Sequence, residues 1–366
     1  MSKNIVLCLD GTGNQLKAKG NTNVVRLFEL LDLSDPSKQI AYYDPGVGTF
    51  SAQGTWTPAG RRTTKLLGLA VGYGLRTNLG EAYTYLMQHY CPGDRIFIAG
   101  FSRGAYTARA LTGMLNAVGL LRPGSENLVQ YAVSCYCRSK RWSDDDWRQL
   151  HLFAGTFSRK VDGYTRIPVE YLGLWDSVKA AGILRWNLRW LFTRKIPNAR
   201  SVRHAVSIDE KRRPYREYLI EDRGSSPAAH GGADRHTAAE HHVEEVWFAG
   251  VHSDIGGTFP DDSRLAQITF KWVVDGALEA GLVLKADAYE KSCTVTPENA
   301  QGGVHRMGWV WVLLTYRRRR VPADAKVHAS VRARISDDPG YRGRIPGTVT
   351  WDDPAWLLPS KYLPAP

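Results

Sequence analysis

The clearest chemical signature in the chain is Gly100-Phe101-Ser102-Arg103-Gly104, which places a serine between two glycines in a Gly-x-Ser-x-Gly pattern. A short apolar run, 95–99, precedes it, and a helix-like stretch from Ala105 to about Val118 follows. A strand, this turn and a helix together form a nucleophile elbow, whose sharp turn exposes the serine hydroxyl. We therefore interpret Ser102 as the nucleophile of an acyl transfer. The backbone N–H of Arg103 is expected to face the oxyanion.

A serine hydroxyl is a weak nucleophile, so this chemistry also needs a base and a carboxylate that orients the base. In hydrolases built on the elbow, the order along the chain is serine, acid, histidine. Asp176 and His252 satisfy that order, and each follows an apolar run of strand length, 169–175 and 245–250. Four of the ten histidines lie in a polar stretch where a solvated surface is expected. We predict that His252 is the base.

The identity of the acid leaves an alternative open. Asp254 lies two residues after His252 and could orient this histidine or brace its loop. Asp176 has the better topological position because a strand of its own carries it. We favour Asp176 as the acid and Asp254 as a supporting carboxylate. His204, ahead of Asp209, is expected to be a buried structural histidine.

A second glycine-rich turn, Asp10-Gly11-Thr12-Gly13-Asn14, follows the apolar run 4–9. Haloacid-dehalogenase phosphatases share Asp-Gly-Thr but need an aspartate two residues earlier, where this chain has Cys8. A dinucleotide-binding fingerprint would need a glycine at position 16, which is Leu16. Neither class fits.

Two interpretations of this turn remain open. In one, the N–H of Gly11 or Thr12 lies opposite that of Arg103 and completes an oxyanion hole. In the other, the segment is a tight turn that merely needs glycine. In either case Asp10 follows a strand-like run and is expected to support the site.

These side chains need a scaffold that brings several strand ends together. Runs of strand length alternate with helix-like stretches such as 64–89, which predicts a mostly parallel sheet with helices on both faces. In such sheets functional groups gather beyond the carboxyl ends of the strands. The candidate residues that directly follow such runs are Asp10, Ser102, Asp176 and His252. The sequence therefore predicts an α/β fold of the α/β-hydrolase type.

No linker separates two cores, so residues 1–366 are expected to form a single domain with inserted lid and loop segments. The stretch 221–242 is polar and is expected to be a surface insertion. The stretch 183–216 is rich in arginine and tryptophan and is expected to form a cap or lid. Trp186 and Trp190 would then present acyl substrates to the serine. The alternative is a buried cap helix.

Composition excludes several classes of protein. With 43% hydrophobic and 23% charged residues, the chain is neither disordered, collagenous nor a coiled coil. The excess of 48 Lys+Arg over 36 Asp+Glu gives a net charge of +12, which favours anionic partners such as phospholipid surfaces or nucleic acid. No nucleic-acid module is recognisable, so that partner is not expected. The run Arg317–Arg320 is either a solvated strand end or an anion patch.

The cysteines and the apolar runs of the chain indicate the cellular compartment in which the protein is expected. Five cysteines without a metal-binding spacing indicate reduced thiols and no metal site. No apolar run approaches 18 residues, and the first apolar run is too short for a signal peptide. The expected location is the cytoplasm, with export only by a route that does not read a cleavable signal.

Several longer motifs occur together and in order. They are Leu9–Asn14, Tyr43–Gly48, Gly100–Arg109, Leu172–Val178, Arg203–Glu210 and Trp247–Gly257. In this combination the chain resembles the DUF2235 family of α/β-hydrolases, which includes a class of type VI secretion lipase effectors. The resemblance spans about residues 5 to 260. It implies a triad of Ser102, Asp176 and His252 and esterase or phospholipase chemistry.

Two functional hypotheses follow. The first is a serine esterase or lipase, possibly a phospholipase, that forms an acyl-enzyme, needs no cofactor and touches a membrane surface peripherally. The second is a non-catalytic binding or scaffold protein that engages an anionic partner on a hydrolase fold. The presence of all three triad residues favours the enzyme. The oligomeric state stays open.

Overall fold

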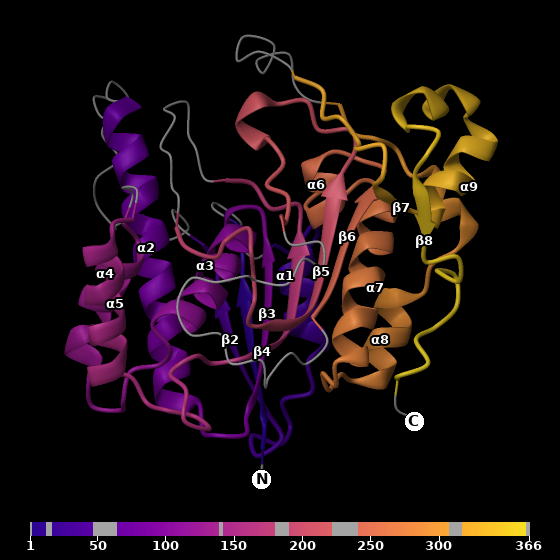
Figure 1. Ribbon diagram of the computed structural model, residues 1–366. Helices are drawn as coiled ribbons and strands as arrows, with labels where there is room; N and C mark the ends of the chain where they lie inside the picture. Colours follow the sequence, from indigo (N-terminus) through magenta and orange to yellow (C-terminus); the bar gives the residue numbers. More distant parts are fainter. Residues whose placement is uncertain are drawn as a thin grey trace.

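The computed structural model describes residues 2–11, 17–46, 64–138, 142–179, 190–221, 241–306 and 317–363. Their strands form one sheet in the order β2-β1-β3-β4-β5-β6-β7-β8 (Figure 1). Every neighbouring pair is parallel. The strands are β1 (Asn4–Leu9), β2 (Gln39–Asp44), β3 (Arg95–Phe101), β4 (Val169–Trp175), β5 (Ala199–Ser207), β6 (His242–Phe248), β7 (Lys326–His328) and β8 (Thr350–Asp352).

The order of the strands places a topological switch point at the carboxyl ends of β1 and β3. After β1 the chain moves outward to β2, then returns past β1 to β3 and continues to β8 in the other direction. The connections that leave β1 and β3 therefore diverge, and such a switch point is where open α/β sheets bind ligands. The elbow serine, which follows β3, lies at this point.

Helices cover both faces of the sheet because successive side chains of each central strand point to opposite faces. In β1, Ile5 and Leu7 join the core under α2, α3 and α4, whereas Val6 and Cys8 join the core under α1 and α7. Figure 1 shows α2 to α5 on one side of the sheet and α7 and α8 on the other. The helices are α1 (Asn23–Leu30), α2 (Thr64–His89), α3 (Arg103–Ala117), α4 (Val129–Tyr136), α5 (Asp144–Phe157), α6 (His252–Gly256), α7 (Arg264–Glu279), α8 (Ala286–Cys293) and α9 (Ala329–Asp337).

The predicted fold class is confirmed, since the sheet is parallel and lies between helices. The expected strands 4–9 and 169–175 and the expected helix 64–89 have the observed bounds. The expected polar insertion, 221–242, falls mostly on residues outside the described part of the chain, and its last residue already begins β6. Among the described residues, no helix is both long and apolar enough to cross a membrane.

The expected cap or lid over 183–216 is wrong for residues 199–207, which form β5 between β4 and β6. Polar side chains in this strand obscured it in the sequence. Arg203 donates from Nε to Glu244 Oε2 at 2.8 Å, and His204 bonds to Glu245. Because their partners stand on the adjacent strand, these polar groups can be buried in a sheet.

Candidate active site

The turn between β3 and α3 is a nucleophile elbow. Ser102 has φ 60° and ψ −120°, a conformation that costs a residue with a side chain about 1–3 kcal/mol. A Cβ on Gly100 would lie 2.7 Å from the carbonyl oxygen of Gly104, and one on Gly104 would lie 2.1 Å from that of Leu9. Both flanking positions therefore require glycine, because the helix and the end of β1 approach the turn so closely.

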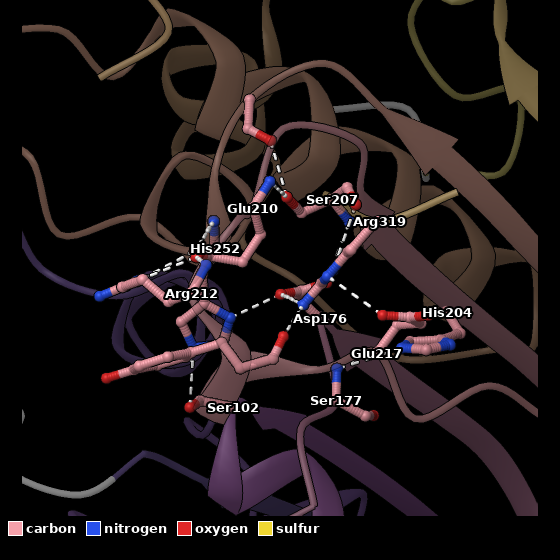
Figure 2. A network of polar contacts seen from close by, with 12 residues as sticks. Ser102, Asp176, Ser177, His204, Ser207, Glu210, Arg212, Glu217, His252 and Arg319 are labelled. Carbon is pink, nitrogen blue, oxygen red and sulfur yellow. Dashed lines mark hydrogen bonds and ion pairs between the residues drawn. The ribbon is translucent and has the colours of Figure 1, made fainter. Parts of the chain in front are cut away.

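Three elements bring the predicted triad into contact. Ser102 follows β3, Asp176 follows β4, and His252 begins α6 just after β6. His252 Nε2 lies 2.8 Å from Ser102 Oγ, and its Nδ1 lies 2.6 Å from Asp176 Oδ2 (Figure 2). The carboxylate can only accept, so Nδ1 carries the proton and Nε2 is free to accept the serine hydroxyl. This is the geometry of a nucleophile, a base and an orienting acid.

Asp254 lies elsewhere in the network. Its Oδ2 accepts the backbone N–H of Val251 at 2.9 Å, and its Oδ1 lies 2.5 Å from Nδ1 of His305. Asp254 thus braces the loop that carries His252 and ties it to the segment around His305. The structure brings Asp176, and not Asp254, to the imidazole of His252.

A buried arginine that sequence reasoning missed holds Asp176 from behind. Arg319 Nη1 lies 2.5 Å from Asp176 Oδ1, and its Nη2 lies 3.0 Å from Oδ2, so the pairing is bidentate. The backbone N–H of Ser207 also donates to Oδ1, at 2.9 Å. Arg319 is separated from Asp176 by 143 residues and lies within the arginine run 317–320. No local pattern distinguishes it from its neighbours.

These contacts set the charge of the triad. Burial alone would raise the pKa of Asp176, but the guanidinium of Arg319 and the hydrogen bond from His252 hold it well below its ordinary value. Burial lowers the pKa of His252, and the pairing with Asp176 offsets only part of this effect. At neutral pH the site therefore holds a carboxylate beside a neutral imidazole, the state that a general base needs.

A second ion pair supports the histidine loop. Glu210 Oε2 accepts the backbone N–H of His252 at 3.2 Å, and Arg212 Nη2 contacts the same oxygen at 2.8 Å. The guanidinium of Arg212 lies 3.8 Å from the ring centre of Tyr215, whose ring packs edge-to-face with the imidazole of His252. These contacts fix the position of the imidazole (Figure 2).

The oxyanion-hole residues have different outcomes. Arg103 is the first residue of α3, where the helix dipole favours negative charge. The expectation for Gly11 is not met, because its N–H donates to Asp10 Oδ1 at 2.7 Å. The other oxygen of Asp10 accepts Thr22 at 2.5 Å and Tyr43 at 3.1 Å, so Asp10 braces this turn. Thr12 lies outside the described residues.

Of the two tryptophans considered for a lid, Trp190 lies in the described part of the chain, and its burial favours the alternative of a buried segment. Trp190 is 3% exposed and packs against Tyr106 and Tyr136, so it belongs to the core rather than to a solvent-facing lid. Its ring also borders a cavity of about 500 Å³ lined by Phe192, Thr193 and Tyr218, among others. Trp186 lies outside the described residues.

His204 has the structural role expected from the sequence. It is buried, its Nε2 accepts the backbone N–H of Ser177 at 3.1 Å, and its Nδ1 donates to Glu245 at 2.9 Å. No group of three or more histidine, cysteine, aspartate or glutamate residues in the described ranges is placed to hold a metal ion.

Comparison with known proteins identifies the family of this chain. A family model described as "T6SS, Phospholipase effector Tle1-like, catalytic domain" matches residues 3–276, which confirms the resemblance carried by the motifs. The uncharacterized protein YEL023C of Saccharomyces cerevisiae is 37% identical over 227 residues, 59% of this chain and 32% of the yeast protein.

Two solved structures are also similar. A crystal structure of an uncharacterized protein from Pseudomonas aeruginosa has a TM-score of 0.45 and 20% identity, and the match covers 86% of this chain and 52% of that one. A structure of the Tle1 effector bound to the VgrG spike from the type 6 secretion system has a TM-score of 0.38 and 18% identity, with 70% and 51% covered. The chain thus spans about a third of the yeast protein and about half of each solved chain.

Proposed function

Because this chain belongs to the family of Tle1-like phospholipase effector catalytic domains, we propose that it is a serine hydrolase that cleaves a carboxylic ester of a phospholipid. The observation that carries the proposal is the chain of contacts from Ser102 Oγ through His252 to Asp176. A strained serine at the end of a strand, within reach of a neutral imidazole, is arranged for acyl transfer.

The proposed reaction begins when Ser102 Oγ attacks the ester carbonyl carbon while His252 Nε2 takes the hydroxyl proton. The carbonyl π electrons move to oxygen, and the negative charge develops near the N-terminus of α3, where the N–H of Arg103 is the proposed donor. Collapse of this intermediate expels the alcohol, which receives the proton from His252. An acyl group now remains on Ser102.

Water completes the cycle by the same route. His252 takes a proton from the water as its oxygen attacks the acyl carbon, and then returns that proton to Ser102 Oγ as the carboxylic acid leaves. Asp176 stabilises the imidazolium that forms in each half of the reaction. Arg319 keeps Asp176 ionised despite its burial, so the carboxylate accepts from Nδ1–H throughout.

A fluorophosphonate probe tests this proposal because it reacts only with an activated serine. We expect a covalent adduct on Ser102, detected by peptide mass spectrometry. The adduct should be absent in Ser102→Ala and retained in Ser134→Ala, a control at an exposed serine of α4. Turnover of p-nitrophenyl esters and phospholipids by the same variants should follow the labelling. Folded protein without an adduct would favour the non-catalytic binding hypothesis.

A further inference from the structure

A cavity of about 770 Å³ lies beside the triad on the side of its acid. Residues 208–211, 317–321 and 343–346 line it. Two of these residues also touch the triad, since Arg319 pairs with Asp176 and Glu210 accepts the backbone N–H of His252. The cavity therefore adjoins the proposed active site at the carboxyl end of β5, the edge of the sheet where ligands of α/β proteins bind.

The acidic residues of the cavity wall are already paired. Asp209 contacts Arg344 and also accepts the hydroxyl of Tyr341 at 2.6 Å. Glu210 forms two charge-assisted hydrogen bonds with Arg212, at 2.9 and 2.8 Å. Arg319 is in turn neutralised by Asp176. These pairs leave no acidic group of the wall to balance further positive charge.

Four basic side chains of the cavity wall have no acidic side chain among the described residues to balance their charge. Arg317, Arg318, Arg320 and Lys211 form no ion pair with any residue in the described part of the chain. The backbone N–H of Arg317 donates to the carbonyl oxygen of Lys211 at 2.7 Å, so the two basic segments are held side by side. Their mutual repulsion would be relieved by a bound anion.

We propose that this cavity binds the headgroup of an anionic phospholipid while the ester of the same lipid reaches Ser102. Guanidinium groups match phosphate oxygens in a bidentate way, and three of them are available here. The volume is that of a small-molecule site and exceeds what an inorganic phosphate would fill. This inference rests on the proposed function, because a phospholipid substrate carries both the ester and the phosphate.

The test separates binding from turnover. In a Ser102→Ala background, sedimentation with phosphatidylcholine vesicles containing about 30% phosphatidylglycerol measures binding without hydrolysis. Replacing Arg317, Arg318 and Arg320 with glutamine should weaken this binding about tenfold or more. A control triple at Arg122, Arg148 and Arg200, exposed arginines outside the cavity, removes the same charge and should change binding less than about twofold.

In the active enzyme, replacing Arg317, Arg318 and Arg320 with glutamine should lower the rate of phospholipid hydrolysis by about the same factor as it lowers vesicle binding. The turnover of neutral p-nitrophenyl butyrate by this variant should stay within about twofold of that of the native enzyme. Equal losses in both triples would overturn the proposal, since only general charge would then matter. Binding of inorganic phosphate that depends on these three arginines, without vesicle binding that depends on them, would overturn the lipid headgroup in favour of free phosphate. If the fluorophosphonate failed to label Ser102 while vesicle binding still depended on the cavity arginines, the proposed function would be contradicted. The anion site would not be.

Discussion

Asp176 and Asp254 are two buried aspartates beside the same histidine loop, and their surroundings are electrostatically opposite. Asp176 faces a bidentate arginine, and its pKa is lowered despite full burial. Among the described residues, Asp254 is held by the backbone of Val251 and by the side chain and backbone of His305, and burial raises its pKa. A buried carboxylate that must stay charged through a reaction needs a cation of its own, whereas one that braces a loop needs only hydrogen bonds.

Removing the groups that act directly on the ester should have the largest effect, because both aspartates act only through His252. We expect Ser102→Ala and His252→Ala each to lower kcat/KM by about a millionfold. Steady-state kinetics on p-nitrophenyl esters measure this, and circular dichroism checks that each variant folds. A folded His252→Ala enzyme with near-normal turnover would contradict the assignment of the base.

Asp176→Asn tests which aspartate orients the imidazole. The amide can donate to Nδ1 and so stabilise the wrong tautomer, and we expect kcat to fall about ten-thousandfold. Asp254→Asn, assayed in parallel, is the matched control. If Asp254→Asn were the more damaging variant, Asp254 and not Asp176 would be the acid.

Arg319 is the group that distinguishes the two sites. Arg319→Gln leaves Asp176 buried without its cation and should lower the free energy of unfolding by about 3–5 kcal/mol. Arg319→Lys keeps the charge but loses the bidentate geometry, and is the variant to assay if the first does not fold.

The pH profile gives a readout of Arg319 that a purely structural role would not move. In the native enzyme, the acid limb of kcat/KM should lie below pH 6.5, because the pKa of His252 is lowered from that value. Arg319 lowers the pKa of both Asp176 and His252. Removing its positive charge should therefore raise the pKa of both groups and shift the acid limb to higher pH. Because Arg319→Lys keeps the positive charge, the profile is measured on Arg319→Gln, and an unchanged acid limb in a folded Arg319→Gln enzyme would show that Arg319 only stabilises the fold.

The smallest effect is expected for Asp254→Asn. An amide keeps an acceptor for Val251 and His305, so kcat/KM should fall less than about tenfold, while the free energy of unfolding falls by about 1–3 kcal/mol. Urea denaturation and ester kinetics on the same preparation measure the two quantities. A large loss of activity without any loss of stability would indicate that Asp254 has a chemical role.

Much of the site follows from the sequence alone because the signals are local. Strands β1 and β4 are mostly apolar runs of strand length, and the Gly-x-Ser-x-Gly pattern between a strand and a helix is itself a local signature of the elbow. The chain order of serine, acid and histidine at three strand ends then predicts which side chains meet, because parallel strands end at one edge of the sheet.

Only the tertiary structure decided the features that depend on partners distant in the chain. The polar strand β5 exists because Arg203 and His204 find their partners on β6. Arg319 looks like its neighbours in a basic run, yet it is the one that is buried against Asp176. Local sequence specifies which conformations the backbone can adopt, but the charge of a buried group depends on which residues the fold places within a few ångströms of it.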